Sequence, residues 1–131
     1  MAKRKVVFVC LHGAAKSVIA AEVYKRRAAE AGLEVEALAL GLEPDPVMAP
    51  GAVRGLLAEG IDVSGSTPRA VTGADLADAA QVVAFGCDLG ALAPAGLDVV
   101  QWPDVPAVSD GYGAARERIG ARVDALVREG T

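Results

Sequence analysis

Short runs of apolar residues alternate along the chain with longer stretches in which apolar positions recur every three or four residues. Short apolar runs are typical of buried parallel strands, and the longer periodicity is typical of helices packed on a sheet. Strands are predicted at residues 5–10, 33–40, 81–87 and 97–103. Helices are predicted at residues 17–31, 51–59, 73–80 and 114–128, with a short helix or turn at 88–96.

The order of these elements predicts an α/β fold. Gly32 and Gly60 follow two of the helical patterns, as expected for left-handed residues that end helices. Alternating strands and helices imply right-handed crossovers, hence a four-stranded parallel sheet with helices on both faces, in one domain over residues 1–131. Ligands of such sheets bind outside the carboxyl ends of the strands, so the loop after the first strand is the first place to search for a site.

Composition narrows the class of protein. The 131 residues suit a single core, and 53% hydrophobic with 4% aromatic residues implies a core of Ala, Val and Leu. No apolar run approaches the ~20 residues of a membrane span, and the start MAKRKVVFVC is too short in apolar residues for a signal peptide. We therefore expect a cytoplasmic protein without a membrane partner. The net charge of −4 disfavours a nucleic-acid surface.

Two cysteines and one histidine limit the possible chemistry. Two cysteines in a cytoplasmic chain do not form a disulfide framework. His12, Cys10 and Cys87 have no spacing typical of zinc ligands, so neither a metal site nor another bound cofactor is expected.

The loop CLHGAAKS, residues 10–17, admits two functional interpretations. Lys16 and Ser17 match the end of the nucleotide-binding pattern G-x-x-x-x-G-K-[ST], but Ala15 and Cys10 stand where that pattern has glycines. A nucleotide loop is therefore disfavoured.

The second interpretation is a cysteine nucleophile beside an anion nest. Successive amides that continue into a helix N-terminus bind a tetrahedral oxyanion, and the helix dipole and Lys16 would stabilise a Cys10 thiolate. Gly13 suits a positive φ, and Ser17 is placed to donate to the sulfur or to cap the helix. The alternative is that Cys10 is a buried hydrophobe. The expected oxyanion-binding residues are Leu11, His12, Gly13, Ala14, Ala15, Lys16 and Ser17.

The sequence of this loop and of several later segments resembles the low-molecular-weight protein tyrosine phosphatase superfamily, especially its arsenate reductase branch. VVFVCLHGAAKS is similar to the family's V-C-x-H-N-x-x-R-S loop, and the segments ALGLEPDPVMAP, GIDVSGSTPRAVT, DAAQVVAFGC and QWPDVP resemble later family segments in the same order. The resemblance implies the family's fold and makes Cys10 the nucleophile that attacks phosphorus or arsenic. Lys16 stands where the family has arginine, and this exchange is not conservative because arginine binds two oxygens with a planar fork.

The resemblance also implies roles for two residues outside the loop. Asp104 corresponds approximately to the phosphatase general acid, although Val105 separates it from Pro106. Cys87 corresponds to a second redox cysteine of arsenate reductases, while no third cysteine follows it at residues 92–94. A Cys10–Cys87 disulfide, an external thiol, or a thioredoxin- or glutaredoxin-like partner would then complete reduction. An inert Cys87 is the alternative.

Three functions follow from these expectations. The first is an arsenate reductase-like enzyme that uses the Cys10 thiolate, with Cys87 as resolving cysteine. The second is a phosphatase that hydrolyses phosphomonoesters through a cysteinyl-phosphate. The third is a catalytically impaired module that binds oxyanions or phosphoproteins, because Lys16 replaces arginine.

Overall fold

Four parallel strands form a sheet in the order β2-β1-β3-β4, in the computed structural model, which describes residues 3–130. The strands are β1 (Arg4–Cys10), β2 (Val35–Gly41), β3 (Gln81–Ala84) and β4 (Val99–Gln101). Side chains of β1 alternate between two apolar clusters, with Val6 and Phe8 in one and Val7 and Val9 in the other. Because β1 is buried on both faces, the buried strand predicted from its uninterrupted apolar run is confirmed.

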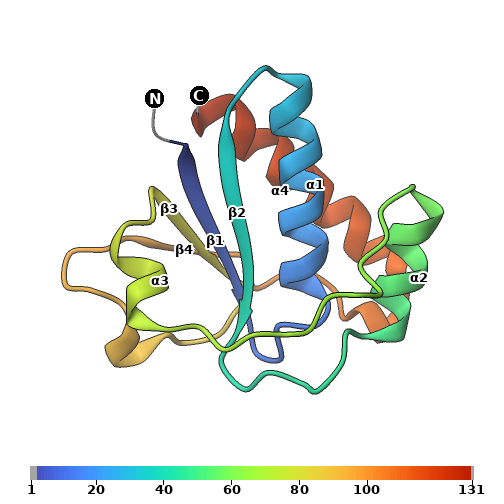
Figure 1. Ribbon diagram of the computed structural model, residues 1–131, viewed down its shortest axis with the longest axis horizontal. Helices are drawn as coiled ribbons and strands as arrows, with labels where there is room; N and C mark the ends of the chain where they lie inside the picture. The colour runs from blue at the N-terminus through green and yellow to red at the C-terminus, as the bar shows by residue number, and fades with distance from the viewer. Residues whose placement is uncertain (1–2, 131) are drawn as a thin grey trace.

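Helices cover both faces of this sheet, as Figure 1 shows. The helices are α1 (Lys16–Glu30), α2 (Pro50–Ala58), α3 (Gly73–Ala77) and α4 (Tyr112–Gly130), with 3-10 turns η1 (Gly90–Leu92) and η2 (Val108–Asp110). Residues of α1, α2 and α4 join the apolar cluster on one face, and Leu76 of α3 joins the cluster on the other. The predicted α/β fold is therefore confirmed. None of the helices within residues 3–130 has the length and apolar character needed to cross a membrane.

Two strands are shorter than the sequence predicts. β3 ends at Ala84 and not at Cys87, because Gly86 takes a φ of +78° and turns the chain away from the ladder. The side chain of Gln101 then binds this turn, accepting from the Gly86 amide at 3.0 Å and donating to the Cys87 carbonyl at 3.0 Å. Cys87 therefore lies in a loop beyond the strand.

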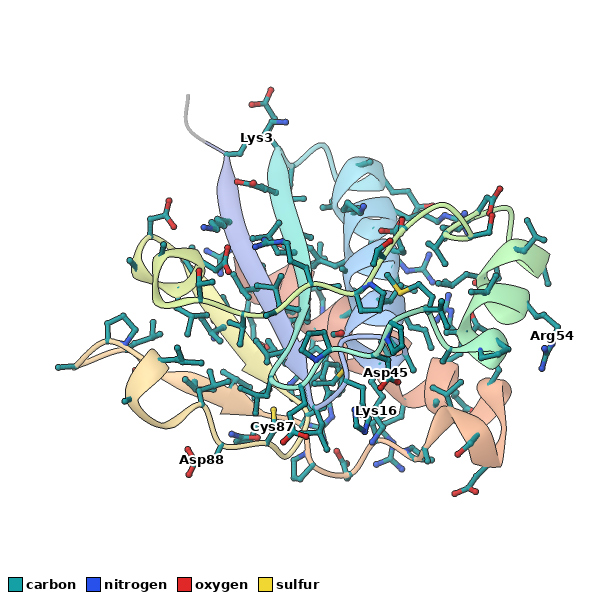
Figure 2. All side chains as sticks on the ribbon, turned by 60° about the horizontal axis from the view of Figure 1, so that its bottom comes forward. Lys3, Lys16, Asp45, Arg54, Cys87 and Asp88 are labelled. Carbon is teal, nitrogen blue, oxygen red and sulfur yellow. The ribbon has the colours of Figure 1, made fainter. Side chains whose placement is uncertain are left out.

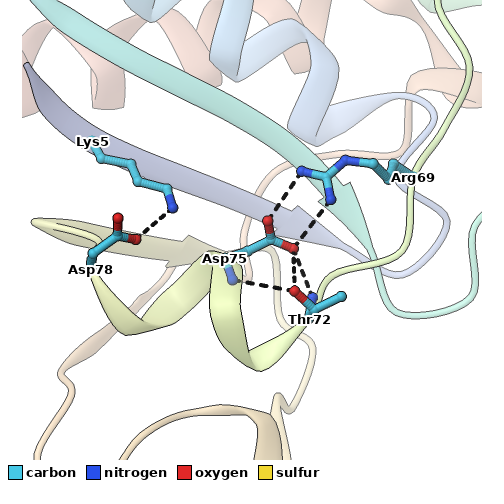
Figure 3. Close-up of polar contacts among 5 residues, drawn as sticks. All are labelled: Lys5, Arg69, Thr72, Asp75 and Asp78. Carbon is cyan, nitrogen blue, oxygen red and sulfur yellow. Dashed lines mark hydrogen bonds and ion pairs between the residues drawn. The ribbon is translucent and has the colours of Figure 1, made fainter.

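The short helix α3 is fixed by polar contacts at both ends, which Figure 3 shows. Thr72 and Asp75 form a reciprocal capping box at its N-terminus, and Arg69 pairs with Asp75 at 3.1 Å. At its other end Asp78 pairs with Lys5 of β1 at 2.6 Å. The segment that leads into α3 also binds the end of β2, because the Gly41 amide donates to the Arg69 carbonyl at 2.9 Å. These contacts hold the carboxyl end of β2 in place.

Candidate active site

The loop between β1 and α1 turns its carbonyl groups outward and leaves its amides free. Its carbonyls accept hydrogen bonds from the segment after β2: Cys10 from Leu42, Leu11 from Glu43, His12 from Asp45 and Ala14 from Ala49, at 2.7 to 3.3 Å. In the part of the chain that the structure describes, the amides of residues 11 to 17 donate to no backbone carbonyl. Unpaired amides on one loop that leads into a helix N-terminus have the chemistry of an anion nest.

Gly13 and Gly41 allow this loop to pass directly against the end of β2. Gly13 has a φ of +62°, and a Cβ atom built on it would lie 2.7 Å from the Gly41 nitrogen. A Cβ atom on Gly41 would lie 2.6 Å from the Gly13 nitrogen. Two backbones are therefore in contact where no larger side chain fits, and the positive φ expected for Gly13 is confirmed.

Cys10 lies at the end of β1 with its thiol next to a buried hydroxyl. Its Sγ atom is 3.0 Å from Oγ of Ser17, in the first turn of α1, and Ser17 is fully buried. A thiolate only accepts hydrogen bonds, so the Ser17 hydroxyl would donate to the sulfur in that state. The contact therefore places a hydroxyl group beside the sulfur at the start of α1.

A cavity of about 370 Å³ opens above Cys10. The β1–α1 loop contributes one wall, with His12 and Lys16 as its charged or polar side chains. The start of α2 and Phe85 contribute apolar surface, and the loop before α4 contributes Ala107, Val108 and Ser109. Within residues 3–130, the lining of this cavity includes one carboxylate, that of Asp45.

His12 and Asp45 meet at this cavity. Nδ1 of His12 lies 3.3 Å from a carboxylate oxygen of Asp45 and 3.3 Å from the backbone carbonyl of Glu43. The pair is half-exposed, with side-chain exposures of 54% and 48%, so solvent reaches it. Figure 2 shows Lys16 and Asp45 close together at the edge of the sheet where the strands end. The cavity thus holds a thiol, an amine, an imidazole and a carboxylate.

Asp104 does not reach this cavity, contrary to the expectation that it acts as general acid. Its carboxylate pairs with Arg118 at 2.5 Å and Arg122 at 2.6 Å, both on α4. These contacts, with the hydrogen bond from Arg122 foremost, lower the pKa of Asp104. The physical reason is local packing: Val105 and Val108 are buried, which turns Asp104 outward toward α4.

Cys87 lies near Cys10 but outside the cavity lining. Its thiol donates to the Val9 carbonyl at 3.5 Å, beside the residue that precedes Cys10. Burial raises the pKa of the Cys87 thiol, and the neighbouring Cys10 adds to the rise. The side chain packs against the apolar cluster on the face of the sheet opposite α1. The structure therefore brings the two cysteines to adjacent positions at the end of the sheet without placing both in one pocket.

Comparison with known proteins identifies the family. The family model described as low molecular weight phosphotyrosine protein phosphatase matches residues 5–91. The chain belongs to this family. No curated protein matches the sequence. The matched range contains the nest and Cys87 and ends before Asp104.

Solved structures of this fold include proteins with different activities. YfkJ from Bacillus subtilis is 21% identical, with a TM-score of 0.85 over 98% of this chain and 95% of that one. A thioredoxin-dependent arsenate reductase from Corynebacterium glutamicum is 23% identical, with a TM-score of 0.76 over 98% of this chain and 64% of that one. A low molecular weight protein tyrosine phosphatase from Bacillus subtilis is 19% identical, with a TM-score of 0.76 over 95% of each chain. At these identities the likeness shows the shared fold and does not choose between the activities.

Several residues that line the cavity were not found from the sequence. Asp45 and the segment Ala49–Gly51 lie after β2, and Ala107 and Ser109 lie after β4. A signal for Asp45 was present, because parallel strands end at one edge of a sheet and Asp45 follows the strand next to β1. The side chain of Ala107 has no reactive or polar group that would mark it in the sequence, so only the fold shows that it lines the cavity.

Proposed function

We propose that this member of the low molecular weight phosphatase family is a thiol-dependent arsenate reductase. The observation that carries the proposal is the Cys10 thiol beneath a nest of unpaired amides, with Ser17 at 3.0 Å and Lys16 lining the same cavity. This arrangement suits attack by a thiolate on a tetrahedral oxyanion whose oxygens the amides hold.

The reaction has two steps. The Cys10 thiolate attacks arsenic of H₂AsO₄⁻, a sulfur–arsenic bond forms, and an oxygen leaves as water after it takes a proton. A second thiolate then attacks the sulfur of Cys10, the sulfur–arsenic bond breaks, and arsenic keeps the electron pair and leaves as arsenite. Arsenic is reduced by two electrons, and the two thiols are oxidised to a disulfide.

Cys87 is the proposed second thiol. Its position beside Val9 puts it at the same end of the sheet as Cys10. Because its pKa is raised, little of it is thiolate at neutral pH, and its attack on Cys10 speeds up as the pH rises toward that pKa. The loop after Gly86 has to shift for the disulfide to form. A dithiol protein of the thioredoxin or glutaredoxin type would return the disulfide to thiols.

A phosphomonoesterase is the second candidate, and the cavity supports it. Its volume of about 370 Å³ exceeds what a bare oxyanion needs and falls in the range of pockets for small organic ligands. The apolar wall of Phe85, Ala49 and Val108 suits an aryl group. Against it, no carboxylate of the loop before α4 lines the cavity, where it would protonate a leaving alcohol.

A single-turnover experiment separates these functions. Reduced protein is mixed with arsenate in the absence of external thiol, and arsenite and free thiols are measured. A reductase that uses Cys87 forms one arsenite per chain and loses both thiols, and Cys10→Ser and Cys87→Ser each form none. In parallel, an aryl phosphate is supplied to the same three proteins.

Each outcome has a distinct meaning. Aryl phosphate hydrolysis that needs Cys10 and not Cys87, without arsenite formation, would show a phosphatase. Arsenite formation by Cys87→Ser only when a small thiol is added would move the second step to an external reductant. Binding of inorganic phosphate without turnover of either compound would show the impaired module, and the enzyme proposal would be wrong.

A further inference from the structure

The first step of the proposed reaction needs a proton donor, and the residues of the loop before α4 that line the cavity include neither a carboxylate nor an imidazole, because Asp110 of that loop lies outside the lining. Its contributions to the cavity are Ala107, Val108 and Ser109, and Asp104 is paired with Arg118 and Arg122. An oxygen that leaves arsenic as hydroxide is a poor leaving group unless a neighbouring acid protonates it. The donor therefore has to come from another wall of the cavity.

His12 belongs to the lining contributed by the β1–α1 loop, and the neighbours of its ring determine its tautomer. Two oxygens face Nδ1, the Glu43 carbonyl and the Asp45 carboxylate, each at 3.3 Å. Neither oxygen can donate a hydrogen, so Nδ1 carries the hydrogen in the neutral ring as well as in the charged one. Within residues 3–130, no side chain or backbone group binds Nε2, which leaves that atom to exchange protons with a ligand.

This arrangement is that of a carboxylate that orients an imidazole. Asp45 contacts the ring through Nδ1 at 3.3 Å, and His12 lines the cavity together with Cys10. His12 is two residues from Cys10 in a loop whose carbonyls are fixed to the segment after β2. The reactive side chains that line the cavity with it are those of Cys10, Lys16 and Asp45.

We propose that His12 is the general acid of the first step and that Asp45 is its positioning residue, an inference that rests on the proposed function. As the Cys10 thiolate forms its bond to arsenic, the As–O bond opposite the sulfur breaks and the departing hydroxide takes the Nε2 proton of the imidazolium. The products are the sulfur–arsenic adduct, water and a neutral imidazole. Solvent returns the proton to the half-exposed ring.

The tautomer can be measured directly because His12 is the only histidine of the chain. In ¹⁵N spectra above the ring's titration, the proposal expects a hydrogen on Nδ1 and none on Nε2. Inorganic phosphate added to wild type or to Cys10→Ser should shift the Nε2 resonance, because the bound anion contacts it. A hydrogen on Nε2, or no shift of Nε2 when phosphate binds, would overturn the proposal whether or not the protein reduces arsenate.

Kinetic measurements test the proton transfer from His12. His12→Asn keeps a donor that reaches the Glu43 carbonyl and so keeps the loop braced, but it has no proton to give at the position of Nε2. We expect kcat for arsenate-dependent thiol oxidation to fall on the order of 10²-fold, KM to change little, and added imidazole to restore part of the rate. Asp45→Asn should give a smaller loss of roughly 10-fold in kcat.

Glu36→Gln is the matched control, because Glu36 is an exposed carboxylate at the opposite end of β2. It should keep wild-type kcat. Full activity of His12→Asn, or a loss of activity that imidazole does not restore, would overturn the acid role. A wild-type protein that reduces no arsenate would instead overturn the proposed function, and the phosphate-induced shift of Nε2 would still decide whether His12 contacts the bound oxyanion.

Discussion

The two loops that contribute to the lining of the cavity are built in different ways. The β1–α1 loop is fixed by backbone contacts, since its carbonyls bind the segment after β2 and Gly13 lies against Gly41. The loop between β4 and α4 is fixed by side chains, since Trp102, Val105 and Val108 are buried in the core. The first loop presents amides to the cavity, and the second presents small or apolar side chains.

This difference explains why the groups suited to bind an oxyanion come from the β1–α1 loop and not from the loop before α4. Backbone amides keep their direction whatever the neighbouring side chains are, provided that the loop keeps its path. A side-chain acid depends on where its loop turns it, and Arg118 and Arg122 hold Asp104 on the far side of its loop. The amides of the β1–α1 loop are therefore left without backbone partners in the described residues, while the carboxylate of Asp104 lies in ion pairs with α4.

Gly13→Ala should damage the first loop most. The new Cβ atom would lie 2.7 Å from the Gly41 nitrogen, and the alanine would have to adopt a φ of +62°, so the loop has to move. We expect a loss of about 1–3 kcal/mol in the free energy of unfolding and a loss on the order of 10²-fold in oxyanion turnover. Denaturant unfolding and single-turnover arsenate reduction would measure the two effects.

Gly32→Ala separates strain from steric conflict. Gly32 has a similar φ of +75°, but no heavy atom lies within 4 Å of a Cβ built there. The Gly32→Ala substitution should lower the free energy of unfolding by about 1 kcal/mol and leave turnover unchanged. Equal effects of the two substitutions on turnover would refute the idea that contact with Gly41 sets the path of the loop.

Lys16→Arg should strengthen the binding of an oxyanion by the same loop. A guanidinium binds two oxygens of an oxyanion in one plane, whereas the lysine amine gives a single point charge. We expect turnover of arsenate to rise roughly 10-fold, with tighter binding of inorganic phosphate. Lys16→Gln is the control that removes the charge and should weaken phosphate binding. A decrease in turnover with arginine would mean that this cavity is shaped for lysine.

Asp104→Asn should have the smallest effect, and on stability alone. The lowered pKa of Asp104 means that its ion pairs stabilise the fold above its ordinary pKa of about 3.9 and that this contribution is lost as the pH falls through the lowered value. The variant should therefore melt below wild type at pH 7, and the difference should become smaller at an acidic pH below the ordinary pKa of Asp104.

Two comparisons check this interpretation of the second loop. Asp98→Asn changes an exposed aspartate that has no ion pair within residues 3–130, so it should leave the melting temperature unchanged at both pH values. Asp104→Asn should keep full turnover. A large drop in turnover would return Asp104 to the catalytic mechanism.

The fold could be predicted from the sequence where local patterns decide it. The apolar run of β1, the periodicity of α1 and α4 and the glycines Gly32 and Gly60 each act through nearby residues. The sequence predicted β3 and β4 too long, and β3 ends early because Gly86 turns the chain away from the ladder, a turn that the distant Gln101 side chain binds.

The residues of the candidate site could likewise be predicted only where they lie close together in the sequence. Cys10, Gly13, Lys16 and Ser17 are close in sequence, so their spacing alone indicates a nest. The position of Asp104 depends on arginines 14 and 18 residues away, and Asp45 joins His12 only when β2 lies beside β1. Contacts of this kind require the fold.

The most direct test of the central claim is a titration of the ¹⁵N-labelled protein with inorganic phosphate, followed through the backbone amide resonances. If the β1–α1 loop is an oxyanion nest, the amides of residues 11 to 17 shift most, and those of Asp104, Val105 and Ala107 shift little. The same pattern should occur in Cys10→Ser, because the amides and not the thiol hold the oxygens. Absence of shifts at residues 11 to 17 at phosphate concentrations that shift other amides would contradict the claim.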